Sequence, residues 1–223
     1  FFRFTFPETD SAFILLDAYN KGSQVQIIPK ERKIVGYCRN NHGGVPDNFH
    51  NYFVLEFDHD FTVTYTWQDS VMQEGTEATG DHTGALIGFS TAKGEVVQVK
   101  VASSFISPEQ AELNLDREIG DRTFDEIRTE SQQIWENELG KIRVEGGTED
   151  QRKTFYSCLY RTLLFPRPLH EITAEQDTVH YSPYYGEVLP GYLYTDNGFW
   201  ATFRAGFPFF SLMYPELDAK VMR

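Results

Sequence analysis

The sequence Ser107-Pro108-Glu109-Gln110 marks the point where the hydrophobic pattern of the chain changes from the period of strands to that of helices. Its residues are typical of a helix start: a serine that can cap the first turn, a proline at the first helical position and a glutamine that can complete a capping box. We therefore expect a β-domain before this point and helices after it, which is a multidomain α+β fold.

Short apolar segments separated by turn residues fill the chain before Ser107. The segments 51–57 and 61–67 alternate well between apolar and polar residues, and Asp58-His59-Asp60 joins them as in a hairpin. Repeated short strands of this kind predict an antiparallel β-sandwich over residues 1–107. The strands are expected at residues 3–6, 12–16, 25–28, 33–37, 51–57, 61–67, 84–89 and 96–102.

Two helices are expected directly after Ser107. The first ends at Gly120, and Thr123 caps the second, a highly charged helix with one apolar stripe. A charged helix of this kind is expected to cross between domains, and we interpret residues 108–147 as a helical linker. A further helix begins after Thr148.

A second domain is expected over residues 148–223. Its first helix stops before Pro166, because the residue before a proline disfavours helical geometry. Residues 166–195 contain four prolines and are expected to form a long irregular segment. The helix from about residue 198 to 214 is expected to be bent or broken around Pro208.

The first candidate ligand site is the stretch from 194 to 205, in which a turn leads into an aromatic helix start. Asp196 or Asn197 can cap that helix. Trp200 and Arg204 are four residues apart and share one helix face, which suits a polyhydroxylated ligand such as a sugar. The alternative is an aromatic helix start buried in a core with Arg204 paired to a carboxylate, and composition alone favours it.

A polar loop in the β-domain, Cys38–Asn48, is the second candidate. It is longer than a hairpin needs, and long loops on a rigid sandwich often carry function. Asn41 and His42 offer neutral donors and acceptors for hydroxyl groups. His42 could also bind a metal, but no second ligand lies at helical or hairpin spacing. A solvated connection is the alternative.

Charge and composition exclude several classes of function. The net charge of −13 argues against nucleic acid as a partner, because binding it needs a basic surface. No apolar run reaches about 18 residues, so no membrane span is expected. Cys38 and Cys158 are too few for a disulfide framework and are expected to be free thiols, one in a loop and one on a helix face.

The motifs together resemble those of the family 92 glycoside hydrolases, which are calcium-dependent, exo-acting α-mannosidases. In that family a turn of the type Tyr-Thr-Asp-Asn-Gly-Phe leads into Trp-Asp-Thr-Phe-Arg, and this chain reads Trp200-Ala201-Thr202-Phe203-Arg204. Other stretches agree in the family's order. They are Arg3-Phe4-Thr5-Phe6-Pro7, Gly36-Tyr37-Cys38-Arg39, Ser104-Phe105-Ile106-Ser107, Phe155-Tyr156-Ser157-Cys158-Leu159-Tyr160 and His180-Tyr181-Ser182-Pro183-Tyr184.

The resemblance implies that residues 148–223 are the start of an (α/α)6 barrel, with an active site at its junction with the sandwich. It implies removal of terminal α-linked mannose from mannosides or N-glycans by calcium-assisted, inverting hydrolysis, in a periplasmic, cell-surface or secreted protein. The catalytic acid and base and most calcium ligands come from later in the family's barrel. No catalytic residue is therefore expected in this chain, and no metal ligand is assigned.

The resemblance also implies a substrate-binding role for Trp200, Ala201 and Arg204, and Asn41 and His42 are expected near the substrate opening. The family's aspartate is Ala201 here, by divergence or by deliberate replacement, and alanine cannot hydrogen-bond a sugar hydroxyl. Two alternatives to an active mannosidase follow: a catalytically impaired carbohydrate-binding protein on the same scaffold, and a purely structural module.

Overall fold

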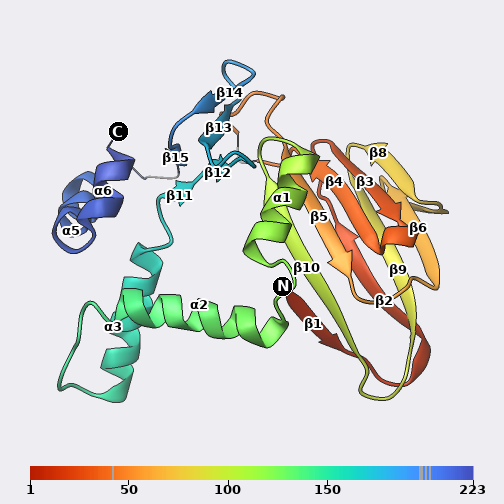
Figure 1. Cartoon of the computed structure of the whole chain (residues 1–223), viewed down its shortest axis with the longest axis horizontal. Coiled ribbons are helices and arrows are strands. Elements are labelled where there is room, and N and C mark those ends of the chain that lie inside the picture. Colours follow the sequence, from red (N-terminus) through yellow and green to blue (C-terminus); the bar gives the residue numbers. More distant parts are fainter. Residues whose placement is uncertain (42, 196–197, 199, 201, 223) are drawn as a thin grey trace. The chain divides into compact units, whose positions relative to one another are not determined.

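Figure 1 shows the computed structural model of the chain, which describes residues 1–41, 43–195, 198, 200 and 202–222. The chain divides into two compact units. Residues 1–124 and 181–188 form the first unit, and residues 125–180 and 189–223 form the second. The three-part division expected from the sequence stays a prediction.

Two antiparallel sheets make up most of the first unit, which confirms the expected N-terminal antiparallel β-domain. The strand order is β1-β10-β5-β4-β3-β8 in the larger sheet and β2-β9-β6-β7 in the smaller one. The strands are β1 (Phe2–Thr5), β2 (Thr9–Asp17), β3 (Ser23–Ile28), β4 (Lys33–Cys38), β5 (Asn51–Phe57), β6 (Val63–Gln68), β7 (Val71–Glu74), β8 (Glu77–Gly80), β9 (Thr83–Thr91) and β10 (Val96–Ser104).

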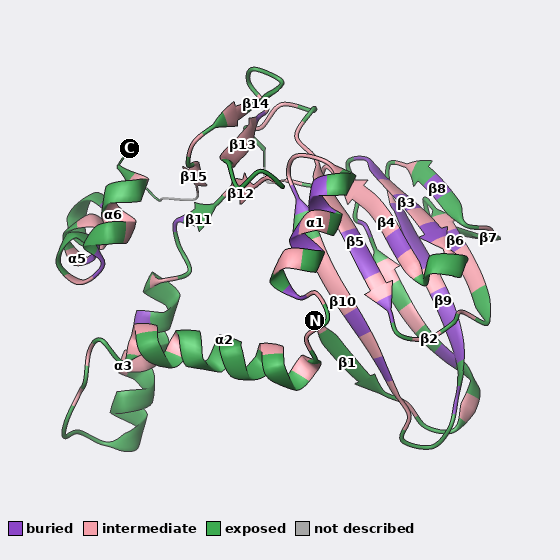
Figure 2. Cartoon of the chain, in the orientation of Figure 1, coloured by how far each residue is buried: buried purple, intermediate pink, exposed green. Residues whose placement is uncertain are grey.

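Both sheets contribute side chains to one hydrophobic core. Val25 and Ile34 come from the larger sheet, and Ile87 and Phe89 from the smaller one; each is almost fully buried. The Phe89 ring lies at the centre of an aromatic cluster, 5.9 Å from the Phe61 ring and 6.2 Å from the Phe57 ring between centroids. Figure 2 shows buried residues on several strands of both sheets.

Two strands of the first unit were not expected from the sequence. All four residues of β7 are exposed, and β8 buries only Ala78. Neither segment therefore alternates strongly between apolar and polar residues, which is the signal for a strand. β7 exists because it pairs with β6, and β8 because it pairs with β3.

α1 (Pro108–Glu118) begins where the capping signal predicts. The Ser107 side chain accepts a hydrogen bond from the backbone N–H of Gln110 at 3.1 Å. Ala111 and Leu115 pack against Val54 of β5, so α1 covers part of the larger sheet. The helix belongs to the first unit.

The second unit contains helices and short strands. α2 (Phe124–Leu139) buries none of its side chains, and α3 (Glu149–Thr162) buries Leu159. Thr148 and Gln151 form a reciprocal capping box at the start of α3, as a helix beginning after Thr148 requires.

The expectation that residues 166–195 are irregular is wrong. β11 (Arg167–Pro168) pairs with β15 (Tyr194–Thr195), and a three-stranded sheet contains β12 (His170–Ile172), β13 (Thr178–Ser182) and β14 (Glu187–Pro190). These strands are too short for an alternating pattern to be recognised. Their prolines lie at strand ends or on edge strands, where a missing N–H is tolerated.

The helix expected from about 198 to 214 is broken on the N-terminal side of Pro208. A π-helical turn, η2 (Thr202–Gly206), leads into α5 (Phe207–Met213), with Pro208 in the first turn of α5. Proline has no N–H to continue the helical hydrogen bonds, which accounts for an irregular turn before it. α6 (Pro215–Val221) follows and begins at a proline.

Candidate functional site

The Trp200–Arg204 segment has the geometry that its spacing predicts. The Cζ atom of Arg204 lies 5.8 Å from the centre of the Trp200 ring, within the range of a cation–π contact. Trp200 is 72% exposed and Phe203 is 71% exposed. Within the described residues, neither ring is buried in a core.

Thr202 fixes the start of this segment. Its backbone N–H and its hydroxyl both donate to the carbonyl of Gly198, at 3.0 and 2.7 Å. Thr202 itself is buried, which leaves the neighbouring Trp200 and Phe203 facing outward. Ala201 lies outside the described residues, as do Asp196 and Asn197, so the roles expected for these three stay predictions.

An aromatic cluster that the sequence did not single out precedes the turn. The His170 ring makes edge contacts with Tyr192 and Tyr194, with centroids 4.8 and 5.1 Å apart. Burial, and to a smaller extent the neighbouring Tyr192, raise the pKa of Tyr194. The alternation Tyr192-x-Tyr194 is the only signal that places both rings on one side of the chain.

Asn41 stabilises the turn of its own loop in the first unit. Its amide nitrogen donates to the Arg39 carbonyl at 2.9 Å, and its amide oxygen accepts from the Gly43 N–H at 2.7 Å. Half of the hydrogen-bonding capacity of the side chain is thus used within the loop. His42 lies outside the described residues.

The polar loop is also attached to the tip of the β13–β14 hairpin within the first unit. The Asn48 side chain donates to the Pro183 carbonyl at 3.0 Å, and the Tyr184 hydroxyl donates to the Gly44 carbonyl at 3.0 Å. The loop is therefore more than a solvated connection. It belongs to a different unit from Trp200, so a shared site stays a prediction.

Both cysteines are free thiols, as expected. Cys158 is exposed on α3, but Cys38 is the last residue of β4 and not a loop residue. Burial raises the pKa of Cys38, with a smaller opposing effect of a hydrogen bond from the backbone of Asn40. A thiol in this state is a weak nucleophile, so we assign it no chemical role.

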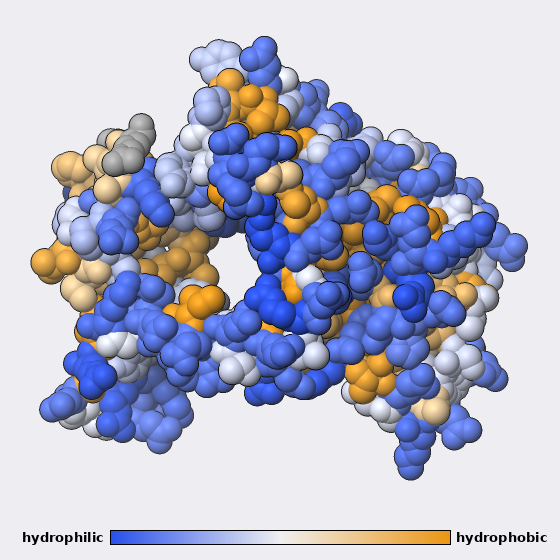
Figure 3. Space-filling model, viewed as in Figure 1, coloured by the Kyte–Doolittle hydropathy of each residue, from blue (hydrophilic) through white to orange (hydrophobic). Residues whose placement is uncertain are grey.

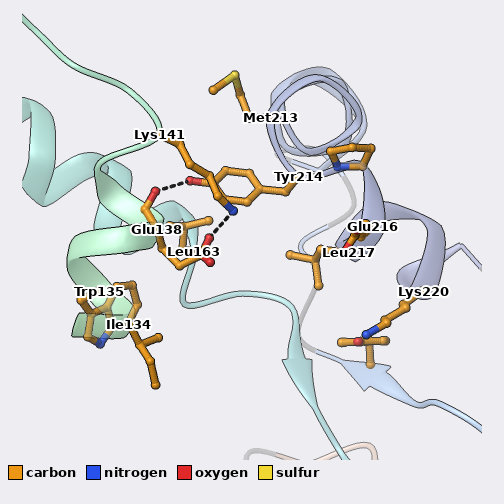
Figure 4. A pocket seen from close by; sticks show the side chains of 12 residues that line it. Ile134, Trp135, Glu138, Lys141, Leu163, Met213, Tyr214, Glu216, Leu217 and Lys220 are labelled. Carbon is orange, nitrogen blue, oxygen red and sulfur yellow. Dashed lines mark hydrogen bonds and ion pairs between the residues drawn. The ribbon is translucent and has the colours of Figure 1, made fainter. Parts of the chain in front are cut away.

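The second unit contains an open cavity of about 610 Å³, shown in Figure 4. Its apolar wall includes Trp135, Leu163 and Leu217, and its polar wall includes Glu138 and Lys141. The Lys141 ammonium lies 2.6 Å from the Glu138 carboxylate, so this charge pair is matched within the wall.

The described residues contain no group of three or more His, Cys, Asp or Glu side chains that could hold a metal ion. In the same part of the chain, no helix combines the length and apolar character needed to cross a membrane.

Comparison with known protein families matches both parts of the chain to domains of one family. Residues 1–104 match the glycosyl hydrolase family 92 N-terminal domain, and residues 110–223 match the catalytic domain of the same family. A search of curated proteins found no significant match.

Among solved structures, the chain is similar to the family GH92 inverting mannosidase BT2199 from Bacteroides thetaiotaomicron, with 46% identity and a TM-score of 0.94 over 98% of this chain and 30% of that one. It is also similar to the α-mannosidase BT3965 of the same organism, with 30% identity and a TM-score of 0.85 over the same shares. That second enzyme has also been solved with mannoimidazole. The chain thus spans about a third of the length of these relatives.

Proposed function

The chain belongs to glycosyl hydrolase family 92, and on this basis we propose that it is a portion of an exo-α-mannosidase. The full-length protein removes terminal α-linked mannose from mannosides or N-glycans with inversion at the anomeric carbon. The observation that carries the proposal is the match along both family domains, together with 46% identity to an inverting mannosidase.

The exposed pair of Trp200 and Arg204 supports a role in sugar binding. An indole ring offers a flat apolar face to the C–H groups of a pyranose, and a guanidinium beside it offers several fixed N–H donors to hydroxyl groups. The 5.8 Å contact between the two side chains holds both on one face of the helical segment. In the proposed enzyme, this face contacts the terminal mannose.

The catalytic carboxyl groups and the calcium ligands are proposed to lie in the part of the catalytic domain beyond this chain. An inverting glycosidase needs an acid and a base about 6.5–9.5 Å apart, to leave room for the attacking water. Lys141 pairs with the Glu138 carboxylate in the cavity wall, and the described residues form no metal cluster.

We further propose that the helices of the second unit begin an (α/α)6 barrel. Phe203 is 71% exposed and Leu212 is 79% exposed. Figure 3 shows hydrophobic surface over the α5 and α6 helices. Apolar helix faces of this kind are normally covered in a folded domain, and further barrel helices are the covering that the family match supports.

The replacement of the family's aspartate by Ala201 favours one alternative, an impaired protein that binds carbohydrate without efficient turnover. The test measures mannose released from a synthetic α-mannoside by the full-length protein, with calcium and with a chelator. Mannose release that depends on calcium supports the proposal. Mannose binding without release favours the impaired protein, and no binding at all would leave only a structural role.

We also propose a periplasmic, cell-surface or secreted location, which cell fractionation tests.

A further inference from the structure

We propose that Tyr214 is a positioning residue, which fixes the segment that carries Trp200 and Arg204 to the C-terminal end of α2. The inference rests on the proposed function for what the segment binds. The anchoring itself rests on contacts within the second unit.

Tyr214 lies at the junction of two helices and is held there from both sides. Its backbone N–H donates to the Phe210 carbonyl of α5 at 2.7 Å, and its carbonyl accepts from the Asp218 N–H of α6 at 3.0 Å. Its ring packs against Phe209 and Phe210, with centroids 5.8 and 6.2 Å apart, and the residue is 6% exposed. Its position is therefore coupled to that of both helices.

The hydroxyl of Tyr214 reaches out of this junction to another helix. It donates to the backbone carbonyl of Glu138 at 3.1 Å, as Figure 4 shows. Glu138 lies in the last turn of α2, at the negative end of the helix dipole, and its carbonyl also accepts a hydrogen bond from the Lys141 N–H at 3.4 Å. The phenol makes the shorter of these two hydrogen bonds and the one that comes from another helix junction.

Lys141 strengthens the same contact. Its ammonium lies 4.2 Å from the centre of the Tyr214 ring and 2.6 Å from the Glu138 carboxylate, so it bridges the two residues. Burial raises the pKa of Tyr214. The charge of Lys141 lowers this pKa by a smaller amount, and the charge of Glu138 raises it further. The phenol is therefore protonated at neutral pH and remains a donor.

The contact can act on the sugar-binding face because the intervening segment is helical. The π-helical turn η2 leads directly into α5, which ends at Met213 next to Tyr214, and Arg204 lies ten residues before Tyr214. A displacement of about 1 Å in a binding group can cost a large part of catalysis.

The chain offers a matched control in Tyr156 of α3. Its hydroxyl donates to the Ile142 carbonyl at 3.1 Å, in the connection that follows α2. Tyr156 is part-buried, and its replacement by phenylalanine removes a hydroxyl that donates to a backbone carbonyl, as in Tyr214, and that also accepts from the Val144 N–H at 3.4 Å. α3 does not carry Trp200 or Arg204, so the control reports a loss of stability without a loss of positioning.

The experiment compares Tyr214→Phe with Tyr156→Phe in the full-length protein. It measures amide hydrogen exchange in peptides that cover residues 202–213, the melting temperature, and kcat and KM on an α-mannoside. We expect both variants to melt slightly earlier. Only Tyr214→Phe should exchange at least about threefold faster in residues 202–213 and lose at least about threefold in kcat/KM. Lys141→Met should also speed hydrogen exchange in residues 202–213 and lower kcat/KM, but by less than Tyr214→Phe.

Unchanged exchange in Tyr214→Phe overturns the anchoring. Faster exchange with unchanged kcat/KM overturns the link to the sugar-binding face, and equal losses of kcat/KM in both variants reduce Tyr214 to a general stabilising residue. If the wild-type protein releases no mannose, the proposed function fails. The exchange comparison still decides whether Tyr214 anchors the segment.

Discussion

The two compact units differ in how much of their apolar surface they bury. In the first unit, Val25, Ile87 and Val97 show no exposed surface, and two sheets share the core. In the described part of the second unit, the buried hydrophobic residues are Leu159, Phe210 and Tyr214. Figure 2 shows the same contrast, with buried strands in the first unit and largely exposed helices in α2 and α3.

The contrast shows which unit has the means to fold alone. Burial of apolar surface contributes about 25 cal/mol per Å², and it must offset the conformational entropy of every ordered residue. The first unit has a continuous core for this purpose. The second unit depends on helix caps and on single contacts such as that of Tyr214 with Glu138.

The most drastic test of this contrast is to cut the chain after residue 124, which separates the two units except for residues 181–188. We expect residues 1–124 alone to unfold in one cooperative thermal transition, because they contain both sheets and α1. Residues 125–223 alone should show no such transition, because their described part buries only Leu159, Phe210 and Tyr214 among its hydrophobic residues. Near-UV circular dichroism during heating measures both. A cooperative transition in residues 125–223 would break the contrast.

Equivalent aromatic truncations in the two units give the next largest difference. Phe89→Ala should lower the free energy of unfolding by about 3–5 kcal/mol, because Phe89 is 1% exposed within an aromatic cluster. Phe203→Ala in the same chain should change it by no more than about 0.5 kcal/mol, because its side chain is largely exposed.

Urea denaturation of the 223-residue chain measures both truncations. In the full-length protein, the cost of Phe203→Ala should rise if further helices cover that ring. A large cost of Phe203→Ala already in this chain would mean that the second unit has a core of its own.

The sugar-binding segment offers a functional test in the second unit. Ala201→Asp in the full-length protein should raise mannosidase turnover by at least about tenfold, equivalent to about 1.4 kcal/mol of transition-state stabilisation. The added carboxylate would accept hydrogen bonds from sugar hydroxyls, and such bonds can tighten in the transition state.

Steady-state kinetics and thermal melting of the two full-length forms decide the matter. Unchanged turnover with a lowered melting temperature would show that the site has repacked around alanine. An aspartate there would then be buried without a partner.

The smallest expected effect is a pH dependence in the first unit. Burial alone would lower the pKa of His59, but its hydrogen bonds with Asp58 and Glu95, at 2.6 and 3.1 Å, outweigh burial and raise it. The resulting stabilisation is fully present below the unfolded pKa of histidine, about 6.5, and is lost as the pH rises through the higher folded pKa.

His59→Gln should remove this dependence. Urea titrations of residues 1–124 between pH 5 and about 8.5 should therefore converge for wild type and variant at the alkaline end. Glu95 contributes a pH dependence of stability at acid pH. The backbone N–H of Ala92 and then the His59 ring lower its pKa, so its contribution disappears only as the pH falls through that lowered value. A constant difference across the whole range would exclude His59 as the titrating group.

The sequence by itself determined the kinds of element and several of their ends. Ser107 with Gln110 and Thr148 with Gln151 set the starts of α1 and α3, and both pairs are three residues apart. The contact of Trp200 with Arg204 is equally local. Such signals involve neighbours along the chain, so helical and strand periodicity are sufficient to predict them.

Only the tertiary structure decided which distant groups meet. β7, β8 and the short strands after Pro166 form because partner strands accept their hydrogen bonds, while their own residues alternate weakly. The Tyr214 hydroxyl reaches a carbonyl 76 residues away. Periodicity states which face of an element is apolar, but it does not state which element will cover that face or which carbonyl will lie opposite a given donor.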